Sequence, residues 1–346
     1  KMCRRTWVLW HIFFCNVLSC EGSNRQKRTK RGCPMVKMRE ANYCNLKLLL
    51  IFLVVYGHWI ELSIHDSEIL MLQYRIIYSF HMPVFVFLTG LFLRRQADCT
   101  RQLKRLAPTY LICQTGAVLW GVDPREPCWI LWYLFSTCIW AALGAVWFRL
   151  GRKRLAWVLL PLSVLAGAVA GYLPFLNRMW SGSRTVVFFP YFFAGLLCDP
   201  HTEWRRYRTA GIIAGMIAVC GIWALADGVP VSFLYHASGY GNLEHGFVLR
   251  LSCYGIGALM CFFLLTWTPG RRFPFTKAGA DTMPVYLVHA PVVACIRWFP
   301  VPWIGCAGLS AVLIYAIYRI NLWRGPCFGV MTQARRERRV RISRNL

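Results

Sequence analysis

The sequence predicts an all-α integral membrane protein, a bundle of about ten transmembrane helices with both termini in the cytoplasm. The first observation is composition: 57% of the 346 residues are hydrophobic, only 16% are charged, and the mean hydropathy is +0.43. A water-soluble protein does not have this balance. The second observation is a regular recurrence of long apolar runs. The third is an alternation of charge between the loops that separate these runs.

The apolar runs from Asn45 onward each contain roughly 16 to 22 residues, enough to cross a hydrocarbon layer as a helix. Residues 45–320 are therefore predicted to form one ten-helix membrane domain, followed by a basic cytoplasmic tail at 321–346. The predicted spans are 46–62, 74–93, 106–122, 129–148, 155–174, 185–200, 209–226, 247–267, 279–297 and 302–320.

The first 44 residues form a basic N-terminal extension of doubtful structure. Residues 6–20, TWVLWHIFFCNVLSC, have the length of a signal-peptide core, but the basic run at 24–32 resists export. This segment therefore stays in the cytoplasm, lies in the membrane interface, or precedes a natural start at Met35 or Met38. We favour the later start because the regular pattern begins only near Asn45.

Charge alternates between successive loops and predicts the orientation. The loops at 94–105, 149–154, 201–208 and 269–277 together hold fifteen Lys and Arg, whereas the intervening loops hold three. Basic loops stay on the cytoplasmic side, which makes the loops at 61–73, 122–128, 174–184, 227–246 and 298–302 external. The net charge of +26 would suggest nucleic-acid binding in a soluble protein, but topology accounts for it and we exclude that partner.

Three histidines lie at predicted membrane depth. His58 follows Lys47, at the cytoplasmic edge of its span, by about 16 Å along the helix axis. His81 lies about 10 Å into the second span and His289 about 15 Å into the ninth. Ionisable groups at this depth are functional candidates by default, although a neutral histidine can also link helices through a hydrogen bond.

Other residues near these histidines leave two interpretations open. Glu61, three residues after His58, could orient the imidazole ring, but a solvated helix end is the simpler interpretation. Arg75, Arg184 and Arg250 lie near external helix ends and either extend to the lipid headgroups or bind a substrate that enters from outside. The 16 cysteines contain no CxxC pair and no zinc-ligand spacing, and therefore predict neither a metal site nor a disulfide framework.

Five segments in order carry a resemblance to a known family. NLKLLLIFLVVYGHWIE, YRIIYSFHMPVFVFLTGLFLRR, WILWYLFSTCIW, SRTVVFFPYFFAGLL and DTMPVYLVHAPVV resemble segments of the acyltransferase family 3 integral membrane O-acyltransferases, most closely the fucose 4-O-acetylase-like branch. The most specific match is the basic residue and histidine separated by ten residues, Lys47 and His58. The resemblance covers residues 42 to 320.

The resemblance implies transfer of an acyl group, usually acetyl, from cytoplasmic acyl-CoA to a hydroxyl of an envelope carbohydrate in a bacterial plasma membrane. Acyl-CoA is then a co-substrate, and no permanently bound cofactor is expected. A neutral imidazole can remove the hydroxyl proton, a role that we assign to His58, although an acyl-histidine intermediate remains open.

The remaining site residues are expected to assist this reaction. His81 would polarise or position a reacting group, and Lys47, Arg94 and Arg95 would contact the CoA phosphates. Arg75, Arg184 and His289 would bind substrate. The alternative hypothesis is a transporter or exporter of a glycan or lipid-linked sugar, which would explain the histidines as substrate or proton ligands. No inverted repeat and no acidic residue at mid-depth supports that alternative.

Overall fold

The computed structural model describes residues 34–61, 63–151, 153–176, 179–226, 228–237, 239–241, 245–296 and 302–324. The hydrophobic run at 6–20 and the basic sequence at 335–339 lie outside these residues. The described chain forms helices joined by turns, with no β-strand in those ranges. It divides into two compact units, one comprising residues 60–268 and the other comprising residues 1–59 together with 269–346.

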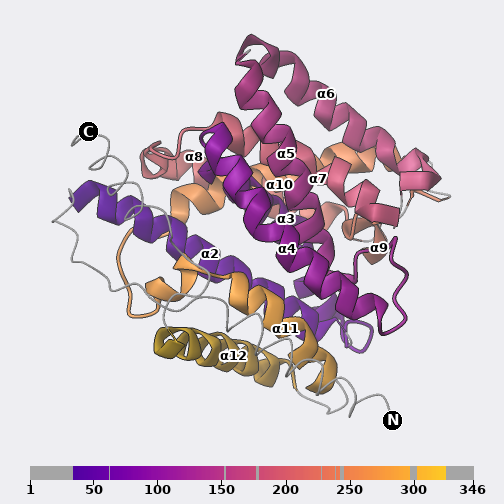
Figure 1. Cartoon of the computed structure of the whole chain (residues 1–346), viewed down its shortest axis with the longest axis vertical. Coiled ribbons are helices and arrows are strands. Elements are labelled where there is room, and N and C mark those ends of the chain that lie inside the picture. The colour runs from indigo at the N-terminus through magenta and orange to yellow at the C-terminus, as the bar shows by residue number, and fades with distance from the viewer. Residues whose placement is uncertain are drawn as a thin grey trace, which may run out of the picture. The chain divides into compact units, whose positions relative to one another are not determined.

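Each of the ten predicted stretches falls on a helix (Figure 1). Six helices in the described chain are long and apolar enough to cross a membrane, at 41–60, 68–92, 129–150, 204–224, 246–267 and 303–320. The number of membrane crossings and their orientation remain predictions. The longer helices are α2 (Pro34–Ile60), α3 (Glu68–Phe92), α4 (Gln96–Val118), α5 (Trp132–Leu150), α6 (Ala156–Val169), α7 (Gly182–Leu197), α8 (Arg208–Ala224), α10 (Gly246–Trp267), α11 (Met283–Ile296) and α12 (Trp303–Arg324).

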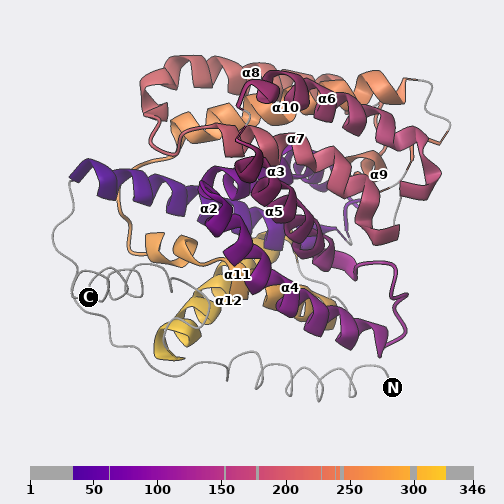
Figure 2. The same cartoon turned by 45° about the horizontal axis from the view of Figure 1, so that its top comes forward.

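In the larger unit, α3 packs along α7, α4 along α5, and α8 along α10 (Figure 2). Glycines set the distance between α3 and α7. A Cβ atom on Gly90 would lie 2.0 Å from the Phe192 carbonyl oxygen, and one on Gly195 would lie 2.1 Å from the Phe87 carbonyl oxygen. Small residues allow two helix backbones to approach in this way. The crossing therefore depends on both glycines.

Helix ends follow from local sequence. Helix α5 stops at Gly151, whose φ of 64° is left-handed and whose N–H bonds the Trp147 carbonyl, as is common at helix C-termini. Helix α3 begins earlier than predicted, because Ser67 is extended and Glu68 supplies a negative charge to the first turn. The predicted start at 74 was therefore wrong. His81 consequently lies near the middle of its helix.

The smaller unit contains α2, α11, α12 and the short 3₁₀ helix η7 (Thr276–Ala280). Helix α2 begins at Pro34, well before the predicted boundary at 46. Asn45 fixes the chain before α11, because its amide donates to the carbonyls of Pro269 and Arg271 at 2.8 and 2.9 Å and accepts a 2.6 Å bond from the Thr276 hydroxyl. These bonds join α2 to residues more than 220 positions later in the chain.

Candidate functional site

Two of the three predicted histidines meet in the smaller unit. The rings of His58 on α2 and His289 on α11 stack with centroids 5.3 Å apart and an angle of 27° between their planes. Nδ1 of the fully buried His289 lies 3.1 Å from the Val285 carbonyl oxygen. A carbonyl can only accept, so in the neutral ring Nδ1 carries the hydrogen. Nε2 is then a buried acceptor, and no described residue forms a hydrogen bond with it.

His81 lies in the larger unit, on α3. Its Nδ1 is 2.7 Å from the Ile77 carbonyl oxygen, which again places the hydrogen on Nδ1 and the lone pair on Nε2. The ring is 5% exposed and meets the edge of the Tyr78 ring at a centroid distance of 4.8 Å. The sequence alone did not single out Tyr78.

Lys47, the predicted basic partner of His58, lies near the middle of α2, whereas His58 lies in its last turn. Its ammonium group donates to the carbonyl of Ala280 at 3.4 Å, at the C-terminal end of η7. Cations are favoured at helix C-termini, where carbonyl oxygens lack helical partners. A contact between Lys47 and CoA remains a prediction.

Two of the predicted substrate-binding arginines bond to one short segment, residues 229–236, which we call the arginine-bound segment. Arg75 on α3 donates to the Val229 carbonyl oxygen at 2.5 Å, and Arg184 on α7 donates to the Tyr235 carbonyl oxygen at 2.9 Å. The Arg184 guanidinium also lies 5.0 Å from the centre of the Trp132 ring. Both side chains therefore have partners within the protein, beyond simple extension to the headgroups.

Arg250, the third arginine at a predicted external helix end, bonds the same segment. It is 1% exposed, donates to the Phe233 carbonyl oxygen at 3.3 Å, and contacts Nδ1 of His236. Its guanidinium lies 4.0 Å from the centre of the Phe233 ring. Aromatic faces and a carbonyl, rather than a carboxylate, thus stabilise this buried cation. Helices α3, α7 and α10 each contribute one arginine to the segment, which contains α9 (Val231–Leu234).

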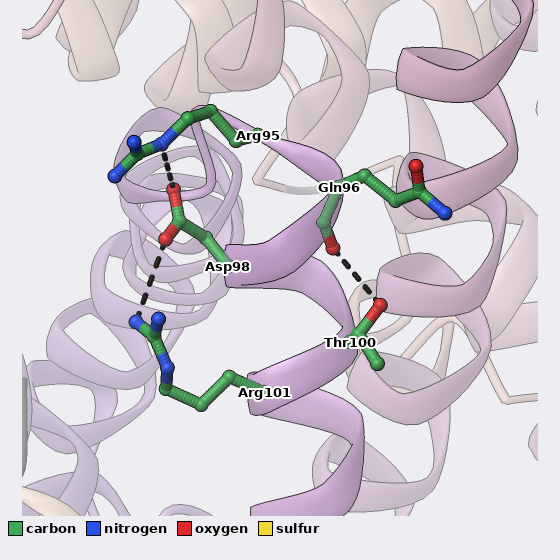
Figure 3. A network of polar contacts seen from close by, with 5 residues as sticks. All are labelled: Arg95, Gln96, Asp98, Thr100 and Arg101. Carbon is green, nitrogen blue, oxygen red and sulfur yellow. Dashed lines mark hydrogen bonds and ion pairs between the residues drawn. The ribbon is translucent and has the colours of Figure 1, made fainter. Parts of the chain in front are cut away.

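A basic pocket lies at the start of α4 in the larger unit. Its volume is about 610 Å³, and its lining residues are Arg95, Gln96, Ala97, Thr100, Arg101 and Lys104. Figure 3 shows Asp98 between two arginines: Arg95 Nε is 3.5 Å and Arg101 Nη1 is 3.4 Å from its carboxylate oxygens. Both arginines remain more than half exposed, at 56% and 55%. Their charge is accessible to an anionic ligand.

Arg94 has a different environment from Arg95, although the sequence predicts the same role for both. Its guanidinium donates to the carbonyls of Leu196, at 3.4 Å, and Cys198. These groups lie at the C-terminal end of α7, where such carbonyls lack helical partners. Arg94 thus joins the end of α3 to the end of α7 and does not line the basic pocket. Its contact with CoA stays a prediction.

The comparison with family models decides the class of protein. The model described as an acyltransferase domain, that of acyltransferase family 3, matches residues 43–319, which extend from α2 into α12. The chain belongs to this family. No curated protein and no solved structure has significant similarity to this acyltransferase. The family assignment confirms the resemblance seen in the sequence, at the level of the family rather than of the fucose 4-O-acetylase-like branch.

The described part of the acyltransferase contains no group of three His, Cys, Asp or Glu side chains that could hold a metal ion. Three sets of its polar side chains bear on the predicted site: the histidine pair of the smaller unit, the basic pocket, and the aromatic and arginine contacts around residues 229–236. The last set is the one that the sequence did not predict as a unit.

A local signal for part of this third set was present in the sequence. Tyr74, Tyr78 and His81 recur at the spacing of one helical face, which predicts that they lie together. Tyr235 and His236 follow a short helix in a loop without periodicity, and no sequence pattern marks them. Their contacts with helices α3, α7 and α10 arise only from the tertiary fold.

Proposed function

We propose that this membrane acyltransferase moves an acyl group, acetyl by its resemblance to O-acetyltransferases, from cytoplasmic acyl-CoA to a hydroxyl of an envelope carbohydrate. The bacterial plasma membrane is the location that this chemistry implies. Family membership supports acyl transfer, and the apolar helices support a membrane setting. The identities of the acyl donor and of the acceptor are what we propose.

The observation that carries the proposal is the stacked pair of His58 and His289. A sugar hydroxyl is too weak an acid to ionise at neutral pH, so its attack on a thioester needs a base. In the proposed reaction, neutral His58 accepts the hydroxyl proton as the oxygen attacks the thioester carbonyl. The carbon–sulfur bond then breaks, and the imidazolium returns the proton to the departing CoA thiolate. His289 holds the His58 ring in position through the stack.

A second route uses histidine as the nucleophile. The imidazole nitrogen would attack the thioester, release CoA and carry the acyl group until the sugar hydroxyl displaces it. Both routes have the same net products and differ in whether labelled acyl group remains on the protein before acceptor is added. His81, with its Nε2 lone pair, is proposed to position or polarise a reacting group.

The basic pocket is proposed to bind the phosphates of the acyl donor. Arg95, Arg101 and Lys104 provide three cations at one mouth, and guanidinium groups bind phosphate oxygens through paired hydrogen bonds. Most of the lining side chains are exposed, so phosphate groups can reach them from solvent. Arg94 and Lys47 remain candidates for contacts with the rest of CoA.

The test uses purified protein in nanodiscs with labelled acetyl-CoA, and follows CoA release and labelled protein. His58→Ala should abolish turnover while CoA binding and insertion persist. His201→Ala, a change to an exposed histidine in the loop after α7, is the matched control and should retain activity. An active His58→Ala protein would refute the assigned role.

The transporter alternative makes the opposite prediction. Movement of a glycan across proteoliposomes without acetyl-CoA, together with no CoA binding in calorimetry, would replace acyl transfer as the proposed function. CoA binding without transport would exclude that alternative.

A further inference from the structure

The arginine-bound segment, residues 229–236, is held from three directions. Arg75, Arg184 and Arg250 come from three helices, and all donate to main-chain carbonyls of this segment. Holding three long cationic side chains in one arrangement costs side-chain entropy. A loop that only connects α8 to α10 does not require this arrangement. The contacts fix the backbone around Tyr235.

Tyr235 connects this segment to the histidine of α3. Its ring meets the edge of the Tyr78 ring at 5.6 Å, and Tyr78 meets His81 at 4.8 Å. The buried Tyr74 hydroxyl donates to the Tyr235 oxygen at 3.0 Å. Because Tyr74 is the donor, the Tyr235 proton can be donated to a ligand.

The charges near Tyr235 are of both signs. Burial is the main cause of a raised pKa of the Tyr235 phenol. The hydrogen bond from Tyr74 lowers this pKa, the Glu61 carboxylate raises it, and the Arg184 guanidinium lowers it. The phenol therefore stays protonated at neutral pH. A ligand beside Tyr235 meets the phenol and the Arg184 guanidinium next to the rings of Tyr74 and Tyr78.

We propose that residues 229–236 form the carbohydrate-binding element of the acyltransferase and that Tyr235 orients the acceptor. This inference rests on the proposed function, which it deepens by naming the acceptor site. A sugar presents apolar C–H faces and hydroxyls that both donate and accept. Aromatic rings suit the faces, and Arg184 and Tyr235 can donate hydrogen bonds to the hydroxyls.

Side-chain exposure is consistent with this role. Tyr78, Arg184 and Tyr235 are partly exposed, whereas Tyr74, His81 and Arg250 are buried. The buried residues support the arrangement, and the partly exposed residues can reach a ligand. Tyr235 acts on the acceptor and is not assigned a part in proton transfer.

The experiment compares wild type, Tyr235→Phe and Tyr235→Ala in nanodiscs. The acceptor probes are methyl glycosides of fucose, glucose, galactose and N-acetylglucosamine, supplied with labelled acetyl-CoA. Tyr235→Phe should raise the KM for the best glycoside by about two- to tenfold, the effect of one lost hydrogen bond. Tyr235→Ala should raise it further because the ring is also lost. The rate of CoA release by hydrolysis of acetyl-CoA without a glycoside should be unchanged, and so should the KM for acetyl-CoA.

Tyr172→Phe is the matched control, because Tyr172 is a half-exposed tyrosine of the same unit that contacts Tyr240 rather than Tyr235. It should leave the glycoside KM unchanged. An unchanged glycoside KM in both Tyr235 variants would overturn the proposal. So would an equal loss of water-dependent CoA release, because that result would show a general structural defect.

A second measurement separates this inference from the acyltransferase reaction itself. Saturation-transfer NMR measures glycoside binding without acetyl-CoA. Wild type could fail to transfer acetyl groups and still bind a glycoside that Tyr235→Ala does not bind. That result would support the binding element and refute the proposed reaction. If wild type binds none of the four glycosides, the carbohydrate assignment fails, whatever the fate of acetyl-CoA.

Discussion

The imidazole rings of His58 and His289 stack 5.3 Å apart, and Nδ1 of His289 bonds the Val285 carbonyl. This arrangement leaves one orientation for the His289 ring and supplies a fixed surface for the ring of His58. The stack limits how far the His58 ring can turn, and a base that removes a proton from a substrate needs such positioning.

The first prediction concerns His289. His289→Asn keeps an amide nitrogen near the position of Nδ1 and retains the bond to Val285, but it removes the stacked ring. We expect kcat to fall on the order of tenfold, because the base is less well positioned, with an unchanged KM for acetyl-CoA. His289→Phe keeps a ring and loses both nitrogens. Full activity in both variants would show that His289 only fills space.

The second prediction concerns the glycines between α3 and α7. Gly90→Ala and Gly195→Ala each place a methyl group against a backbone carbonyl, which has little room to move. We expect a loss of about 1–3 kcal/mol in the free energy of unfolding, seen as lower thermal stability in detergent by tryptophan fluorescence. Gly116→Ala in α4 is the control, because a Cβ there meets nothing within 4 Å. It should be neutral or stabilising by up to about 1 kcal/mol.

Equal melting temperatures for Gly90→Ala and Gly116→Ala would contradict the close approach of the two helices. Loss of folding in Gly195→Ala alone would show that only one side of the crossing is tight.

The third prediction concerns Asp98, which pairs with Arg95 and Arg101 (Figure 3). Asp98→Asn removes the carboxylate that competes with a bound phosphate for these arginines. We expect CoA to bind about twofold to fivefold more tightly, within the range for partly exposed ion pairs, and to show a steeper dependence on salt. Calorimetry with CoA at two salt concentrations measures both effects.

Asp123→Asn is the control for charge alone, because Asp123 pairs with Arg125 in a different loop. If Asp98→Asn weakens binding, the carboxylate positions the arginines rather than competing with the ligand. If neither variant changes CoA affinity, the pocket at the start of α4 is not the phosphate site.

The fourth prediction concerns orientation. Alkaline phosphatase fused after residue 126 or 237 should be active, because those loops are predicted to be external. Green fluorescent protein fused after residue 151 or 206 should fluoresce, because those loops are basic and predicted to be cytoplasmic. The opposite reporter result at any of these positions would show that the predicted number of membrane crossings before that position is wrong. Western blots that compare fusion levels provide the control for expression.

Helix positions could be predicted because apolar composition is a local property. Every predicted span overlaps a helix, and the family match confirms the resemblance carried by five segments. Boundaries were less accurate. Helix α3 begins at Glu68 because of its first-turn charge, and α2 continues back to Pro34 beyond its apolar core. A hydropathy pattern detects the apolar part of a helix and not its polar ends.

The contacts of the arginines could not be predicted because they depend on residues far apart in the chain. Arg75 and Val229 are separated by 154 positions, and Arg184 and Tyr235 by 51. The sequence indicated that these arginines were unusual, since each lies near a predicted external helix end. It did not indicate that they share one target. The structure shows that Arg75 and Arg184 hold the backbone of this segment. Their roles in substrate binding remain predictions.

The three arginines reach residues 229–236 through main-chain carbonyls, which every amino acid possesses. Replacement of a side chain at Val231, Ser232 or Tyr235 therefore leaves the acceptors of Arg75, Arg184 and Arg250 in place. The backbone path is thus separable from the side chains displayed at these three positions, whereas Phe233 and His236 contact Arg250 and belong to the support. The surface of this stretch can therefore be varied at positions 231, 232 and 235 while the three surrounding helices keep their arginine contacts.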